Sequence, residues 1–268
     1  MCLHRQPAIN LTNLPMTLLS RVEDAGINAS APPQQRWVDG WLLRFSPGKA
    51  KRARCIQAVA DGRLPLAERL ALCATVLAEA GLPMVVRITP FSRPEGLDAS
   101  LAELGYQMLD DTLVMVATQW PAQVEPLPVG WRLERVGHAA FAEAVGSLRG
   151  SAAGQRAAHA ERLAASPVPY QGWLLGRVGD GRVLACGQTA TEGDLVGLYD
   201  VFTHPAVRGQ GLARRLCAAL LKHARAAGAR VAYLQVDAGN APARAIYRRL
   251  GFVDAYRYHY RTPDADAK

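Results

Sequence analysis

The chain has 268 residues, half of them hydrophobic and a fifth charged, which is typical of a folded globular protein and excludes a disordered or collagen-like chain. This length suits two domains of roughly 100 to 200 residues each. The formal net charge of +8 predicts an anionic partner. Because no block of roughly five or more like charges occurs, a nucleic-acid-binding tail is disfavoured.

No apolar stretch approaches the ~18 residues that a membrane span requires, and the N-terminus lacks the pattern of a secretory signal. We therefore expect a cytoplasmic protein with no membrane partner. Neither Cys-x-x-Cys spacing nor a nearby histidine pair marks any cysteine, so no metal site is predicted. The cysteines are Cys2, Cys55, Cys73, Cys186 and Cys217.

Hydrophobic periodicity predicts an alternation of strands and helices before residue 121. Strands are expected within 37–46 and 54–60, followed by a helix over 65–81, a strand over 83–89, a helix over 96–105 and a strand over 112–117. Segment 121–130 carries three prolines and no periodicity, which indicates a linker. We place a first domain at residues 1–120 and the linker at 121–129.

A similar alternation follows the linker and predicts a second domain at residues 130–262, with a tail at 263–268. Its expected strands are 131–136, 172–179, 182–191, 195–203, 230–236 and 255–261. Its expected helices are 137–150, 157–166, 211–229 and 241–251.

The two domains resemble one another in sequence. Residues 66–88 match residues 212–236 with a two-residue difference in length, and Leu104-Gly105-Tyr106 echoes Leu250-Gly251-Phe252. An internal duplication is the economical interpretation, and a chance match of two amphipathic helix–strand units stays open as the alternative.

A glycine-rich turn joins strand 195–203 to helix 211–229. Gly209 and Gly211 allow a ligand to approach the backbone closely, and the first N–H groups of a helix have no internal partner. Such a turn favours a phosphate or pyrophosphate. Arg208, Arg214 and Arg215 are expected to add positive charge around it.

Two common phosphate motifs do not fit this turn. A P-loop needs a Lys-Ser/Thr pair after the second glycine, where this chain has Leu212-Ala213. A dinucleotide fingerprint needs a third glycine at the position of Arg214. ATP bound by a P-loop is therefore excluded, and NAD is disfavoured.

The remaining pattern, Arg/Gln-x-x-Gly-x-Gly/Ala, is met by Arg208, Gly211 and Ala213 and resembles the acetyl-CoA loop of the GNAT N-acetyltransferase superfamily. The stretch NAPARAIYRRLGF, residues 240–252, is similar to a second signature of that family. The resemblance covers about residues 130–262. It implies an α/β fold (an α+β mixed sheet) with two GNAT-like domains, each a mixed sheet flanked by helices.

The resemblance implies an N-acetyltransferase that moves an acetyl group from acetyl-CoA to a primary amine by direct attack. Tyr247 would protonate the departing thiolate, the Val201 N–H would polarise the thioester carbonyl, and Thr203 would hold the pantetheine arm. The expected cofactor-binding residues are Val201, Thr203, Arg208, Gly209, Gln210, Gly211, Leu212, Ala213, Arg214 and Asn240.

The residue that removes the proton from the amine is less clear. Tyr199 and Asp200 are the two candidates, each acting through water, and Glu192 lies near them in the sequence. Tyr199 shares the strand alternation of Val201, so both side chains are expected on one face. Two plainer interpretations stay open: Asn240 as a helix N-cap and Tyr247 as a core residue.

The first domain lacks what the resemblance requires. Pro65 stands where the second domain has Gly211, which removes an N–H and fixes φ. The other differences are Arg63 for Gly209, Leu101 for Tyr247 and Pro94 for Asn240. We expect a degenerate copy that walls the acceptor site and completes the sheet.

Other functions stay open at this point. A catalytically silent CoA-binding regulatory or scaffold protein is the main alternative, and nucleic-acid binding is disfavoured because the basic residues gather at the turn. The partners expected are acetyl-CoA and an amine, either a small molecule or a peptide. The sequence does not identify the amine, the acyl chain length or the oligomeric state, so a homodimer stays open.

Overall fold

The computed structural model describes residues 14–264 except 47, 49, 122, 124 and 180. Its strands are β1 Gln34–Val38, β2 Trp41–Phe45, β3 Ile56–Gln57, β4 Val86–Ile88, β5 Gln107–Ala117, β6 Trp131–Val136, β7 Tyr170–Arg177, β8 Val183–Glu192, β9 Leu195–Thr203, β10 Val231–Asp237 and β11 Val253–Thr262. Its α-helices are α1 Met16–Ala29, α2 Leu66–Glu79, α3 Leu97–Glu103, α4 His138–Arg149, α5 Ala153–Ala164, α6 Leu212–Ala226 and α7 Ala241–Arg249, with short 3₁₀ turns η1 Lys51–Ala53 and η2 Pro205–Val207.

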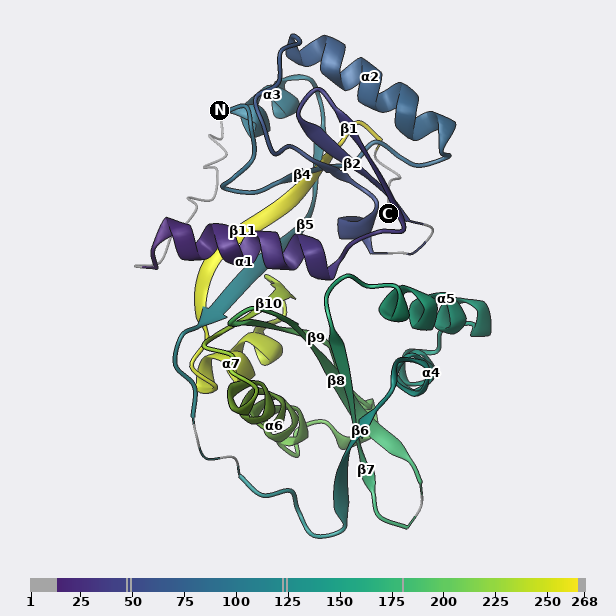
Figure 1. The fold of residues 1–268 in the computed structure, drawn as a ribbon, viewed down its shortest axis with the longest axis vertical. Coiled ribbons are helices and arrows are strands. Elements are labelled where there is room, and N and C mark those ends of the chain that lie inside the picture. The colour runs from purple at the N-terminus through teal and green to yellow at the C-terminus, as the bar shows by residue number, and fades with distance from the viewer. Residues whose placement is uncertain are drawn as a thin grey trace, which may run out of the picture.

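The described strands form one mixed sheet in the order β1-β2-β3-β4-β11-β5-β10-β9-β8-β7-β6 (Figure 1). The predicted alternation of strands and helices is confirmed from residue 37 onward. Segment 37–46 forms the hairpin of β1 and β2, because Asp39 and Gly40 both adopt positive φ and turn the chain. Helix α1 was not predicted. The α/β fold with a mixed sheet is confirmed.

Two long strands cross from one half of the sheet to the other. β5 begins opposite the end of β11 in the first half and ends beside β10 in the second, where Ala117 pairs with Ala232. β11 begins beside β5 in the second half and ends beside β4, where His259 pairs with Ile88. Each half therefore contributes a strand to the other, and the sheet is continuous through its middle (Figure 1).

The two halves follow the same path around this central pair. In the first, β3 is parallel to β4, and in the second, β9 is parallel to β10. Helix α2 begins directly after Pro65 and helix α6 directly after Gly211, as the sequence match predicts. Gly105 and Gly251 both adopt positive φ after α3 and α7, where a left-handed residue ends a helix. This correspondence supports an internal duplication.

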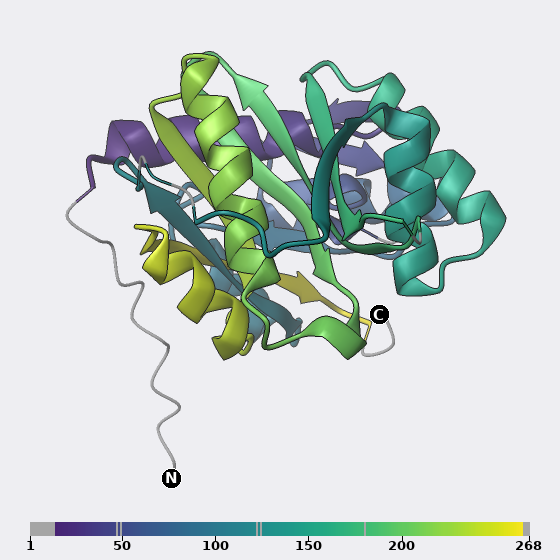
Figure 2. The same cartoon turned by 90° about the horizontal axis from the view of Figure 1, so that it is seen from below.

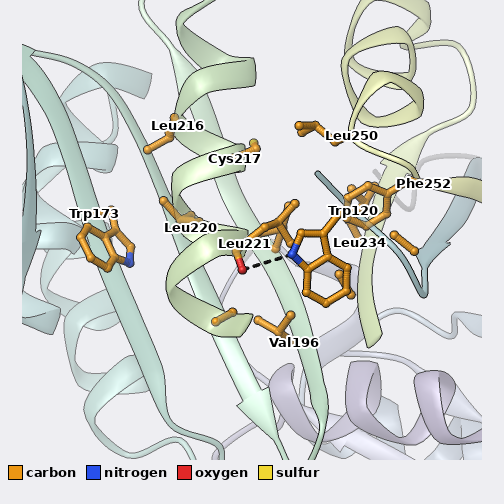
Figure 3. Close-up of a cluster of buried hydrophobic side chains, with 14 of the residues drawn as sticks. Trp120, Trp173, Val196, Leu216, Cys217, Leu220, Leu221, Leu234, Leu250 and Phe252 are labelled. Atoms are coloured by element: carbon orange, nitrogen blue, oxygen red, sulfur yellow. Dashed lines mark hydrogen bonds between the residues drawn. The ribbon is translucent and has the colours of Figure 1, made fainter. Parts of the chain in front are cut away.

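Helices cover both faces of the second half of the sheet. Figure 2 shows α6 and α7 in front of it, with α1 behind. The α6 face holds the largest apolar cluster, in which Leu216, Leu220 and Leu221 are fully buried. Trp120 lies in the same cluster, and its indole N–H donates to the Leu221 carbonyl at 3.3 Å (Figure 3). This packing fixes α6, and therefore the turn before it, against the sheet.

Helix α1 joins the two halves on the opposite face. Its buried residues Leu19, Val22 and Ala25 pack with apolar side chains from β5, β9, β10 and β11. The Tyr170 hydroxyl, on β7, donates to the carbonyl of Ala29 at the end of α1. α1 therefore belongs to the first half in sequence but covers strands of the second. None of the helices described is long and apolar enough to cross a membrane.

Candidate active site

Strands β9 and β10 separate toward their C-terminal ends. They pair in parallel from Leu195 with Val231 as far as Leu198 with Leu234, and no later residue of β9 pairs with β10 among the described positions. β10 continues to Asp237 beside β5, while β9 continues to Thr203 beside β8. The two strands therefore splay apart after Leu198, as the resemblance implies.

A bulge at the splay reverses the expected alternation. Asp200 adopts φ +49°, and Asp200 and Val201 together lie opposite Gly187 of β8. Val201 consequently packs on the α6 face, whereas Tyr199 packs with Tyr170 and the residues near α4 on the other face. The expectation that Tyr199 and Val201 point together is wrong, because the extra residue shifts the side-chain period.

The turn before α6 presents a row of backbone donors. Gly209 and Gly211 adopt φ of +79° and +71°, left-handed conformations that other residues avoid. In the part of the chain that the structure describes, no backbone carbonyl or side chain accepts a hydrogen bond from the N–H groups of Gly209 to Arg214. These groups stand at the positive end of the α6 dipole, so the turn can hold an anionic phosphate group.

The arginines of this turn are already engaged. Arg214 and Arg215 both form ion pairs with Glu125 of the linker, at 2.6 and 3.2 Å. Arg208 donates from Nε to the carbonyl of Thr203 at 3.1 Å. In this structure two of the three guanidinium groups pair with the linker carboxylate, whose pKa they lower, and that all three surround a ligand stays a prediction.

The remaining expected cofactor residues before α7 lie at the end of β9, in the turn and in the first turn of α6. Leu212 is buried in the core, so its side chain anchors the turn, while the Gln210 carbonyl accepts from Arg215 at 3.2 Å. Thr203 pairs with Ala185, and its buried hydroxyl has no hydrogen-bond partner among the described residues. Ala213 lies half-buried in the first turn of α6.

Asn240 is the N-cap of α7, because its side-chain oxygen accepts from the Ala243 N–H at 3.2 Å. The capping interpretation is thus confirmed. The capping bond occupies one lone pair of the amide oxygen and leaves the side-chain NH₂ without a described partner, so capping and contact with a ligand are compatible.

Tyr247 projects from α7 toward the α6 core. Its ring packs edge-on against Phe252, with centroids 5.9 Å apart and an interplanar angle of 64°, and contacts the apolar cluster. Burial raises the pKa of its hydroxyl well above the ordinary value. The hydroxyl is therefore protonated throughout the neutral range and can donate a proton.

Asp200 is the centre of a polar cluster that the sequence did not predict. Its carboxylate accepts from Arg149 at 2.9 Å and from the Gln188 amide at 2.7 Å, and its Oδ2 lies 3.5 Å from His159 Nε2. Burial raises the pKa of Asp200, but the nearby Arg149 and His159 lower it by more than burial raises it. The net pKa is below the ordinary value, so the carboxylate stays ionised. His159 comes from α5, and only folding brings it to β9.

Tyr199, one of the two expected bases, differs in chemistry from His159, the histidine beside the other expected base, Asp200. The Tyr199 hydroxyl donates to the Tyr233 hydroxyl at 3.1 Å, and burial raises its pKa well above the ordinary value, which makes it a poor proton acceptor. Burial lowers the pKa of His159, against the opposing effect of Asp200, so its imidazole is neutral near pH 7. Glu192 lies apart, accepting from Asn28 of α1 at 3.0 Å.

The corresponding turn of the first half contains its own anion. Asp39, from the β1–β2 turn, accepts from the backbone N–H groups of Arg63 and Leu64 at 2.9 Å each. Its carboxylate also pairs with Arg69 at 2.9 Å. These backbone groups precede Pro65 as Gly209 and Gln210 precede Gly211, so an aspartate occupies the place where the second half leaves free donors.

The end of the first-half repeat differs in one detail from the alignment. Helix α3 begins after Gly96 rather than after Pro94, because it is shorter than α7. Leu101, at the position of Tyr247, is fully buried and apolar.

The comparisons with known proteins agree with this geometry. A family model described as "Acetyltransferase (GNAT) family" matches residues 136–252. The uncharacterized N-acetyltransferase YjgM of Escherichia coli is 34% identical over 85 residues, 32% of this chain and 48% of the relative. The chain thus spans about half the length of that relative.

Two solved structures share the fold over nearly the whole chain. A GCN5-related N-acetyltransferase from Kribbella flavida has a TM-score of 0.68 at 19% identity, covering 92% of this chain and 96% of its own. A tandem GNAT protein from the clavulanic acid biosynthesis pathway has a TM-score of 0.66 at 15% identity, covering 87% and 84%. At these identities the likeness concerns the fold alone.

Proposed function

We propose that this chain, whose residues 136–252 match the GNAT acetyltransferase family model, transfers an acetyl group from acetyl-CoA to a primary amine. The observation that carries this proposal is the row of unpartnered N–H groups from Gly209 to Arg214 beside the splayed strands. Phosphate groups suit that row, and beyond Leu198 the backbone of β9 no longer pairs with β10, which leaves its polar groups available to the acyl arm. The residues present therefore fit the cosubstrate.

The chain's own groups match the needs of direct transfer. Acetyl-CoA supplies a thioester whose C–S bond breaks as the bond from the amine nitrogen to the acyl carbon forms. The Val201 N–H lies in the bulge at the splay, and we assign it to the charge that develops on the carbonyl oxygen. Tyr247 gives its hydroxyl proton to the departing sulfur and regains one from solvent.

We assign removal of the amine proton to Asp200 and His159 acting together. Neutral His159 accepts the proton, directly or through one water, and the ionised Asp200 beside it stabilises the imidazolium that forms. Arg149 and Gln188 hold the carboxylate in place. Tyr199 keeps its proton in this scheme and borders the site.

We also propose that the first half, residues 1–120, is a degenerate copy that binds no cosubstrate. Asp39 already satisfies the donors of its turn, and Pro65 cannot adopt the conformation of Gly211. Its contribution is to the walls of the acceptor site and to the sheet.

Incubation with acetyl-CoA and a panel of primary amines, with release of free thiol as the readout, tests the proposal. We expect amine-dependent thiol release and an amine product heavier by one acetyl group. Binding of acetyl-CoA without turnover on any amine would favour a silent CoA-binding protein. Absence of binding would overturn the assignment of the turn.

A further inference from the structure

Arg52 of η1 is a half-buried cation that forms no ion pair within the described chain. Its charge acts on Glu23, but that carboxylate pairs with Arg87. Its Nη1 donates to the Tyr258 hydroxyl at 3.3 Å. Within the described chain, no carboxylate lies within ion-pair distance of it. The neighbouring cations differ: Lys51 pairs with Asp110 at 2.9 Å, and Arg87 pairs with Glu23.

An unmatched guanidinium in such a place is costly for a folded protein, because leaving water weakens the hydration of its charge. Arg44, which also forms no ion pair among the described residues, offsets this cost by donating to the carbonyls of Ile27, Ser30 and Arg52. Arg52 has no such set of acceptors. None of its nitrogens is a fully buried atom without a partner, so the Arg52 N–H groups for which no acceptor is found among the described residues keep some contact with solvent.

Arg52 lies at the splay of β9 and β10, although it comes from the first half. The Tyr258 hydroxyl to which it donates itself donates to Gln235 Oε1 at 2.9 Å. Gln235 directly follows Leu234, the last residue of β10 that pairs with β9. The charge of Arg52 also acts on the hydroxyl of Tyr199, the first residue of β9 beyond the paired segment.

We propose that Arg52 binds a carboxylate of the acceptor, so that the substrate is a small amine that carries a carboxylate, of the amino-acid class. This inference rests on the proposed acetyl transfer. One planar guanidinium matches one carboxylate through two parallel N–H···O bonds. The hydrogen bond from Arg52 Nη1 to the Tyr258 hydroxyl helps to orient the guanidinium. The first half thereby supplies the residue that selects the acceptor.

The test compares matched pairs of acceptors in the acetyl-transfer assay: L-amino acids and the amines that remain when the carboxylate is removed. For the wild-type protein we expect kcat/KM to be about 10- to 100-fold higher for the acid of a reactive pair, as a charge-assisted pair supplies. In Arg52→Gln the preference should fall to about twofold or less, mainly through KM. Arg52→Lys should retain part of it.

Arg36→Gln is the matched control, because Arg36 is an exposed arginine of the same half on β1. It should leave the preference unchanged. The melting curve shows whether Arg52→Gln folds. If it does not, Arg52→Lys and the wild-type preference still test whether Arg52 binds the carboxylate of the acceptor.

Several outcomes would overturn the inference: a wild-type protein that acetylates both members of each pair equally, an Arg52→Gln protein that keeps the full preference, or an Arg36→Gln protein that loses it equally. Failure of the proposed function is distinguishable, since acetyl-CoA would then neither bind nor release thiol with any amine. In that event the melting temperature measured with each acid and its decarboxylated partner tests Arg52 directly. Equal shifts for both members would overturn the carboxylate site.

Discussion

At the scale of single residues, Tyr247 tests the chemistry with the least disturbance to packing. Tyr247→Phe keeps the ring against Phe252 and removes the only proton that the side chain can donate. We expect kcat to fall about 100-fold, the lower end of the ~10²–10⁴ range for general acids, with little change in KM for acetyl-CoA. The loss should shrink at high pH, where a thiolate leaves without help. Steady-state kinetics between pH 6 and 9 measure both effects, and wild-type kcat throughout would show that Tyr247 only packs.

His159 is also a single residue, and we expect its protonation to set the pH dependence of kcat/KM. Because burial lowers its pKa below the ordinary 6.5, the imidazole is neutral and competent above that lowered pKa and becomes protonated as the pH falls through it. We expect kcat/KM to decline on the acid side of the profile below about pH 6.5. In Asp200→Asn, the decline should move to still lower pH, because the charge that raises the pKa of His159 is gone.

His159→Gln should reduce kcat/KM about 100-fold at pH 7.5 and remove the acid limb. His223→Gln is the control, since that histidine is exposed on α6 and stacks on Trp173 with ring centroids 4.4 Å apart. An unchanged acid limb in His159→Gln would assign the proton transfer to another group.

At the scale of elements, the turn before α6 owes its function to its backbone conformation. Gly209 has φ +79°, and a Cβ there meets no atom of the chain within 4 Å, so alanine strains the loop and places a methyl where a ligand would approach. Gly96, the N-cap of α3, has φ +78° and equally open surroundings. Gly209→Ala and Gly96→Ala thus carry the same intrinsic strain, about 1–2 kcal/mol.

Only Gly209→Ala should weaken acetyl-CoA binding, by about tenfold or more, because we place the cosubstrate at the row of free N–H groups from Gly209 to Arg214 and not at Gly96. Isothermal titration calorimetry measures the affinity and the stoichiometry together. We expect one acetyl-CoA per chain in the wild type, since Asp39 occupies the equivalent donors of the first half. Equal weakening in both variants, or two equivalent sites, would contradict this assignment.

At the scale of the whole molecule, the exchange of β5 and β11 predicts that the halves do not fold separately. A fragment of residues 130–262 lacks β5, which lies between β10 and β11, so those strands lose their shared neighbour. We expect this fragment to show no cooperative thermal transition by circular dichroism. The linker at 121–129 would then separate two related stretches of sequence that fold only together.

A protease site inserted in the linker near exposed Gln123 provides the control. The cleaved chain should remain one particle in size-exclusion chromatography, held by β5 and α1. A fragment of residues 130–262 that melts cooperatively at the temperature of the full chain would contradict the prediction.

The sequence by itself determined most of the local structure and one part of the site. Periodicity located nearly every strand and helix, because burial of one face imposes a fixed spacing. The glycines at 209 and 211 indicated the turn before α6, since their conformation is set locally. Helix α1 was missed although Leu19, Val22 and Ala25 have helical spacing, and its importance comes from strands far along the chain that it covers.

Tertiary structure alone decided the rest, because it depends on groups that are distant in sequence. A bulge at Asp200 reversed the direction of Tyr199, which simple alternation cannot foresee. Likewise, Glu125 neutralises two arginines of the turn. The meeting of His159 with Asp200, and of Arg52 with the splay of β9 and β10, requires folded helices and an exchanged strand. Local rules fix each element, whereas the charges and donors that those elements bring together are fixed only when the sheet closes around β5 and β11.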